Sequence, residues 1–97
     1  MSASVPLGEI ALFMCAGEAI TAYWTVNGEP DSVQASRDRG IAVYGDNTDP
    51  VSYKTNLTIP GTVENDNVSI QCVLIDGSNL NHSPIVYLTV LGESYIT

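Results

Sequence analysis

The chain contains very few basic residues, and this shortage excludes several classes of partner. Only Lys54, Arg37 and Arg39 are basic among 97 residues, against 11 Asp and Glu, and the formal net charge is −8. A surface of this charge repels nucleic-acid phosphates and anionic lipid headgroups. We therefore expect neither nucleic-acid binding nor direct membrane contact by this domain.

Long apolar runs are also missing. No stretch approaches the roughly 18 apolar residues that a membrane-spanning helix requires. The first residues, Met1 to Ser4, lack the basic segment and the apolar stretch of a secretory signal. We expect residues 1–97 to form a single domain excised from a larger, multi-domain protein, with any signal or anchor encoded elsewhere.

Residues suited to catalysis or to zinc binding are scarce. Histidine occurs once and cysteine twice, and a zinc site uses three or four such ligands. One loop places a histidine beside hydroxyls and a carboxylate: His82, Ser78, Ser83 and Asp76. Neighbouring loop residues rarely hold the geometry of a catalytic triad. We expect no catalytic residues, no metal and no cofactor.

An acidic cluster raises calcium binding as an alternative to a turn. Asp46, Asn47 and Asp49 offer oxygen ligands at nearby positions. No bidentate glutamate follows at the spacing of a helix–loop–helix calcium site, and the same residues before Pro50 are typical of a tight turn. The sequence favours the turn.

Short alternating segments separated by turn residues make up most of the chain, and they predict an all-β fold. The Asn27-Gly28 pair predicts a two-residue hairpin. Residues 29–38 are ambiguous, with a short strand and a loop, and residues 76–83 form a predicted loop. Strands are expected near 4–7, 9–16, 20–26, 41–44, 51–59, 68–75 and 84–91.

The alternation of each strand predicts which side chains enter the core. Every position that shares a face with one of the two cysteines, or with the tryptophan of the facing strand, is apolar. The central residues of this predicted core are Trp24, Phe13, Leu57, Ile59, Ile70 and Leu88.

The spacing of Cys15, Trp24 and Cys72 resembles that of the immunoglobulin superfamily. The segment Leu57-Thr58-Ile59, followed by Asp66 and Cys72, is similar to the Leu-x-Ile…Asp-x-Gly-x-Tyr-x-Cys run of that family. The resemblance favours the intermediate or constant-2 type, with the variable type as an alternative. It implies an immunoglobulin-like β-sandwich of two antiparallel sheets, joined by a Cys15–Cys72 disulfide against which Trp24 packs. Two unpaired buried thiols, as in muscle-type modules, are the alternative.

Two further features follow from the resemblance. Ile70 stands where the family has the tyrosine that pins one corner of the sandwich, so other contacts must hold that corner. The family also pairs an arginine with the aspartate of this corner. The resemblance implies an ion pair between Arg39 and Asp66, with Arg37 as a nearly equal candidate, and its role is structural.

Three Asn-x-Ser/Thr glycosylation sequons begin at Asn56, Asn67 and Asn81. In the expected fold Asn56 points outward from a strand, Asn67 lies in a turn and Asn81 lies in a loop. All three are therefore expected to be exposed, and we expect at least one to be glycosylated in a eukaryotic secretory setting.

Two outward surfaces are unusually apolar. In the nomenclature of the family, the first lies on strands C, F and G, and such a composition is typical of a protein-binding patch. Its residues are Tyr23, Thr25, Gln71, Val73, Ile75, Ile85 and Tyr87. The second, on strand B, contains Ile10, Leu12 and Met14. Either a sugar on Asn56, a second protein surface or the first strand covers it.

The resemblance and the apolar surface together predict a non-catalytic function. We expect an extracellular protein-recognition or cell-adhesion module, including homophilic pairing, in a secreted glycoprotein or in the ectodomain of a membrane receptor. Partners are then a protein ligand or a second copy of the chain. A structural spacer in a tandem array and an intracellular sarcomere-type module are the alternatives.

Overall fold

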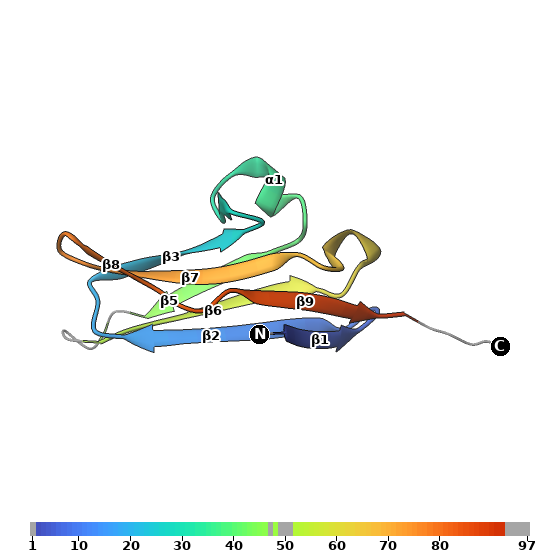
Figure 1. Ribbon diagram of the computed structural model, residues 1–97, viewed down its shortest axis with the longest axis horizontal. Helices are drawn as coiled ribbons and strands as arrows, with labels where there is room; N and C mark the ends of the chain where they lie inside the picture. The colour runs from blue at the N-terminus through green and yellow to red at the C-terminus, as the bar shows by residue number, and fades with distance from the viewer. Residues whose placement is uncertain (1, 47, 49–51, 93–97) are drawn as a thin grey trace.

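The computed structural model describes residues 2–46, 48 and 52–92, and in this part of the chain nearly all regular structure is β. Figure 1 shows the strands running along the long direction of the molecule, with α1 on the side of β3 and β7 that faces away from β2. The elements are β1 (Ser2–Pro6), β2 (Ile10–Gly17), β3 (Thr21–Val26), β4 (Glu29–Pro30), α1 (Gln34–Arg37), β5 (Ala42–Asp46), β6 (Tyr53–Pro60), the 3₁₀ turn η1 (Val63–Asn65), β7 (Ser69–Asp76), β8 (Asn79–His82) and β9 (Val86–Leu91).

Two sheets form the sandwich. One has the order β1-β9-β7-β3-β4, with β8 pairing to β7, and the other has the order β2-β6-β5. This arrangement confirms the predicted immunoglobulin-like β-sandwich. The sheet pairs are antiparallel except for β1, which runs parallel to β9. The first sheet is therefore mixed, which corrects the prediction that both sheets are antiparallel.

A disulfide between Cys15 and Cys72 joins the two sheets, as predicted. Cys15 lies on β2 and Cys72 on β7, and their Cα atoms are 6.5 Å apart. Trp24 lies opposite Cys72 in the β3–β7 register and is only 3% exposed. Its indole Nε1–H donates to the Thr55 hydroxyl at 3.0 Å, and this hydroxyl donates to the Tyr44 carbonyl at 3.0 Å. The polar end of the buried indole is thus satisfied.

The predicted core is confirmed. Leu57, Ile59, Ile70 and Leu88 are at most 1% exposed, and they pack around Trp24 in one cluster. Phe13 packs against the cluster but is only partly buried. A cavity of about 220 Å³ lies beside it, between β2 and the segment from Ser83 to Val86.

The predicted Asn27-Gly28 hairpin is present between β3 and β4. Both residues have positive φ, 54° and 82°, which is the requirement of the turn that matches the twist of the two strands. In the ambiguous region after it, the chain forms only β4 and the single turn α1. Of the predicted turn over residues 46–50, positions 47, 49 and 50 lie outside the described residues.

The predicted loop over residues 76–83 is wrong. Residues 79–82 form β8, which returns along β7 after a turn at Gly77, where φ is 60°. Asparagine and histidine dominate this strand, and residues of low strand propensity give no sequence signal. Pairing with β7 overrides that propensity.

Removing the disulfide should destabilise the domain strongly. We expect the double variant Cys15→Ala/Cys72→Ala to lose about 2–5 kcal/mol of unfolding free energy, because the unfolded chain gains the freedom that the cross-link removes. Urea unfolding monitored by Trp24 fluorescence measures the loss, and reduction of the wild-type protein should reproduce it. A loss below about 1 kcal/mol in both experiments would contradict the structural role of the bridge.

Candidate functional site

The outward side of β3, β7, β8 and β9, together with Ile85, forms one continuous surface, which we call the C-F-G face. Cross-strand registers place its side chains in rows. Tyr23 lies opposite Val73, which lies opposite His82, and the next row places Ile75 opposite Leu80. Neighbours in such rows have side chains on the same side of the sheet.

Most residues predicted for this face are accessible to some degree. Ile85 and Tyr87 are 43% and 49% exposed. The remaining partly exposed members are Tyr23, Thr25, Gln71 and Ile75. Tyr87 on β9 and Ile85 just before it are thus the most exposed residues of the predicted set.

Val73 was predicted as a binding residue, but it is buried in the structure. It is only 1% exposed, although its parity places it on the outer side of β7. Tyr23 lies opposite it on one neighbouring strand and His82 on the other, so Val73 lies between two larger side chains. Val73 therefore supports the face from below instead of contacting a partner.

Leu80 belongs to the C-F-G face and was missed by the sequence analysis. It is 52% exposed and lies opposite Ile75 in the β7–β8 register. A single apolar residue between two asparagines gave no alternation from which a strand could be predicted. Its place on the face depends on the hairpin between β7 and β8.

A break in the last strand of the face positions Ile85 and Tyr87. Between β8 and β9, the Ser83 N–H donates to the Cys72 carbonyl at 2.9 Å and its hydroxyl accepts from the Cys72 N–H at 2.9 Å. The Gln71 side-chain amide donates to the Ser83 carbonyl at 2.8 Å. Gln71, predicted as a binding residue, therefore has a structural bond at this break.

The C-F-G face carries no carboxylate at the outward positions of β3, β7, β8 and β9. The chain has 11 Asp and Glu, yet the rows consist of Thr, Tyr, Ser, Gln, Val, Ile, Leu and His. The surrounding loops and strand ends contain the charge instead. A neutral, partly apolar face on a strongly acidic domain is the main chemical asymmetry of this sheet.

The predicted ion pair between Arg39 and Asp66 is wrong, because both side chains have other partners at the end of the sandwich near η1. Arg39 Nη1 donates to the Glu64 carbonyl at 2.8 Å and to Asn65 Oδ1 at 3.3 Å. The Asp66 carboxylate instead accepts from the Val90 N–H at 2.9 Å. Arg39 and Asp66 both stabilise this end, but through separate partners.

Asn65 is the buried residue that the sequence analysis missed at this end. It is 0% exposed, and its amide donates to the carbonyls of Arg39 at 3.0 Å and Pro60 at 2.9 Å. These bonds tie η1 to the end of β6 and to the segment before β5. An asparagine after a strand gives no sequence signal of burial, because the residue type is common in exposed turns.

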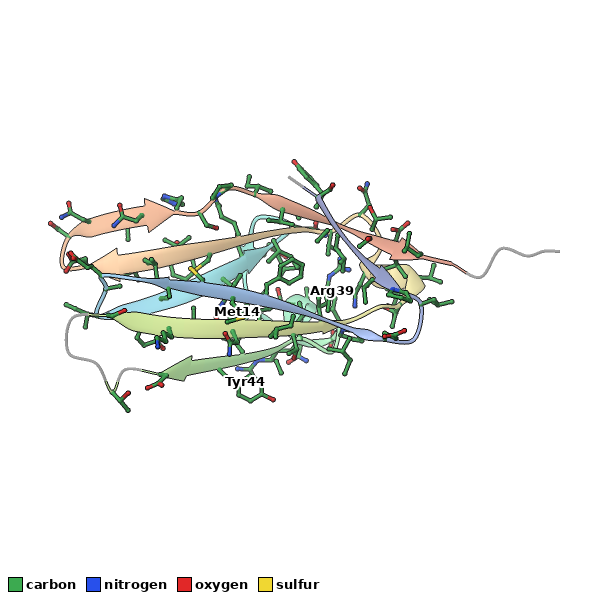
Figure 2. All side chains as sticks on the ribbon, turned by 90° about the horizontal axis from the view of Figure 1, so that it is seen from below. Met14, Arg39 and Tyr44 are labelled. Atoms are coloured by element: carbon green, nitrogen blue, oxygen red, sulfur yellow. A yellow bond between two sulfur atoms is a disulfide. The ribbon has the colours of Figure 1, made fainter. Side chains whose placement is uncertain are left out.

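The outer side of the second sheet exposes still more apolar surface (Figure 2). Exposed fractions are 68% for Ile10, 57% for Leu12, 76% for Met14 and 62% for Tyr44. A groove of about 410 Å³ lies here, with Met14, Tyr44 and Asn56 among its lining residues. We call this surface the B-E-D face: the outward residues of β2, β6 and β5.

The three sequon asparagines lie in different settings. Asn56 is partly exposed on β6, in the B-E-D face. Asn67 is exposed in the turn after η1 with φ of 70°, and Asn81 is exposed on β8. Asn81 therefore lies on a strand and not in the predicted loop.

Asp46 at the edge of the B-E-D face has its carboxylate engaged by its own turn. The Thr48 N–H and hydroxyl donate to Asp46 Oδ1 at 3.0 and 2.8 Å. These bonds, with a smaller contribution from Lys54, lower the pKa of Asp46. Asn47 and Asp49, the other candidate calcium ligands, lie outside the described residues, and the described part of the chain contains no cluster of three His, Cys, Asp or Glu side chains able to hold a metal.

Comparison of the chain with protein-family models and with curated proteins finds no match. Within residues 2–46, 48 and 52–92, no helix is long and apolar enough to span a membrane.

Replacement of Asn65 tests whether its hydrogen bonds stabilise this end of the sandwich. We expect Asn65→Ala to lose about 2–4 kcal/mol of unfolding free energy, because two carbonyls lose their donor and a cavity remains. Glu64→Ala, at the neighbouring exposed position, is the matched control and should change stability by less than about 0.5 kcal/mol. Chemical denaturation of both variants measures the difference, and equal stabilities would refute the role of Asn65.

Proposed function

We propose that this chain is an immunoglobulin-superfamily domain that serves extracellular protein recognition or cell adhesion, and that it binds its partner through the C-F-G face. The partner is a protein, including a second copy of the chain. The sandwich, its inter-sheet disulfide and the tryptophan packed in its core support membership of the superfamily.

The composition of the C-F-G face is the observation that carries this proposal. Ile85, Tyr87 and Leu80 are each 43–52% exposed, while no outward position of the four strands is a carboxylate. Protein interfaces are depleted in charge at their centre and enriched in tyrosine and other aromatics. Tyrosine also gives a large contact area at a small cost in side-chain entropy.

A homophilic contact is compatible with the charge distribution. Two copies with a net charge of −8 repel each other over most orientations. Pairing through the C-F-G face keeps the carboxylates at the periphery of the contact, where solvent screens them. Self-association through this face therefore brings few like charges into direct contact.

The disulfide supports an extracellular location. Such bonds persist in secreted proteins and in ectodomains, and they are rare in reducing compartments. The Cys15–Cys72 bridge thus favours an extracellular module over the sarcomere-type alternative with reduced thiols. An ectodomain of a cell-surface protein and a secreted protein fit this location equally well.

The geometry around His82 supports a non-catalytic function. The hydroxyl of Ser83 accepts a hydrogen bond from the Cys72 N–H and contacts the Pro84 carbonyl at 3.2 Å. This hydroxyl is therefore a structural bridge at the strand break and is not oriented by the imidazole. His82 itself lies beside Val73 on the sheet surface.

Substitutions on the C-F-G face should abolish binding without unfolding the domain. We expect Tyr87→Ala and Ile85→Asp each to weaken binding by at least about tenfold, because truncation of an interface anchor costs more than about 1.4 kcal/mol. Binding of the fluorescent domain to cells of the organism that makes it, together with sedimentation over a concentration range, measures the effect.

The matched control places the same change on the opposite side of the sandwich. Ile10→Asp introduces the same charge at an exposed position of β2 and should leave binding unchanged. Melting temperatures of all three variants should stay near that of the wild type. Unaltered binding by both face variants would remove the proposal, and a domain that is monomeric and binds no cells would favour the spacer alternative.

A further inference from the structure

The B-E-D face exposes more apolar surface than the proposed binding face, and the C-F-G contact does not explain it. Met14 and Tyr44 are 76% and 62% exposed, and Ile10 and Leu12 are 68% and 57% exposed. Large unpartnered apolar surfaces are unusual on soluble domains. The same face contains an asparagine of a glycosylation sequon.

Registers place that asparagine between two exposed apolar side chains of the groove. Asn56 lies opposite Met14 on β2 and opposite Tyr44 on β5, so the three residues form one row across the sheet. Figure 2 looks onto this face, with β6 running between β2 and β5. This row lines one part of the groove of about 410 Å³, and the next row, Ala16, Lys54 and Asp46, lines another part.

We infer that Asn56 carries an N-linked oligosaccharide whose first sugars lie in this groove, against Met14 and Tyr44. The apolar C–H faces of a pyranose pack on an aromatic ring or a thioether, and its hydroxyls remain toward water. The attached chain then covers the apolar surface and makes the face soluble. One residue thus supplies both the attachment point and the reason for the exposed side chains around it.

The chemistry of attachment is a glycosyl transfer from a lipid-linked oligosaccharide pyrophosphate. The side-chain nitrogen of Asn56 forms a bond to the anomeric carbon, the bond from that carbon to the pyrophosphate oxygen breaks, and the amide proton passes to a base of the transferase. Leu57, the middle residue of the sequon, is 0% exposed in the folded domain. The transfer therefore precedes the folding of β6 into the sheet.

The other two sequons lack this setting. Asn67 and Asn81 are both exposed, but neither lines the B-E-D groove. Asn81 on β8 lies opposite Leu74 on β7. Its side chain is therefore on the other side of the hairpin from Leu80 and His82. A sugar on Asn56 leaves the C-F-G face free, since the two faces are on opposite sides of the sandwich.

The inference rests on the extracellular location in the proposed function, because the transfer requires a secretory compartment, but not on the C-F-G contact. Secretion of residues 1–97 behind a heterologous signal from a mammalian cell line, followed by glycopeptide mass spectrometry, tests it. We expect peptides containing Asn56 to carry an oligosaccharide that peptide N-glycosidase removes. Asn56 found unmodified in the secreted protein would overturn the inference.

A second measurement tests where the sugar lies. We expect Asn56→Gln to increase fluorescence of a hydrophobic dye, to self-associate with concentration and to melt about 4 °C or more below the glycosylated wild type. Asn81→Gln, at an exposed sequon position outside the groove, is the matched control and should change none of these. Thr58→Ser changes the same sequon but keeps it functional, and it should retain the sugar on Asn56.

Tyr44→Ser then isolates the packing contact. This variant should remain glycosylated at Asn56, but removal of its sugar should no longer lower the melting temperature. An unchanged dye signal in Asn56→Gln, or full stabilisation by the sugar in Tyr44→Ser, would refute the packing in the groove. The effect of Tyr87→Ala on binding is measured separately, so failure of this inference and failure of the proposed contact are distinguishable.

Discussion

The cross-link between Cys15 and Cys72 is the constraint on which the rest of the structure depends. The two sheets of a small sandwich bury too little surface to exclude alternative packings by burial alone. The bridge fixes β2 against β7 near their centres, with Trp24 beside it and Thr55 accepting its indole N–H. With these four residues in place, the inward parity of both sheets follows, and so do the two outward faces.

Away from the disulfide, polar contacts hold the two sheets together at the end of the sandwich near η1. Asn65 is fully buried and joins the ends of three segments, since it bonds to Arg39 and to Pro60. The Asp66 carboxylate bonds to the backbone of β9. A buried amide with its hydrogen bonds satisfied fixes one geometry, because few alternatives satisfy it.

The C-F-G face and the B-E-D face both expose apolar side chains, and we assign a different covering group to each. Both are apolar on a strongly acidic domain, so neither is a typical solvated sheet surface. We propose that a protein partner covers the C-F-G face and that a sugar on Asn56 covers the B-E-D face. The outward strand positions of the C-F-G face lack carboxylates, whereas Asp46 and Lys54 line part of the groove on the B-E-D face.

The sequence alone determined the fold class, the disulfide pairing suggested by the family resemblance, the core residues and the Asn27-Gly28 hairpin, because these depend on local alternation and on spacing. Only the tertiary structure decided which outward residues are accessible. Val73 is buried in the middle of its sheet, between β3 and β8, and Leu80 joins the face through pairing with β7. The partners of Arg39, Asp66 and Asn65 were also decided there, because the exposure and bonding of a side chain depend on neighbours distant in the chain.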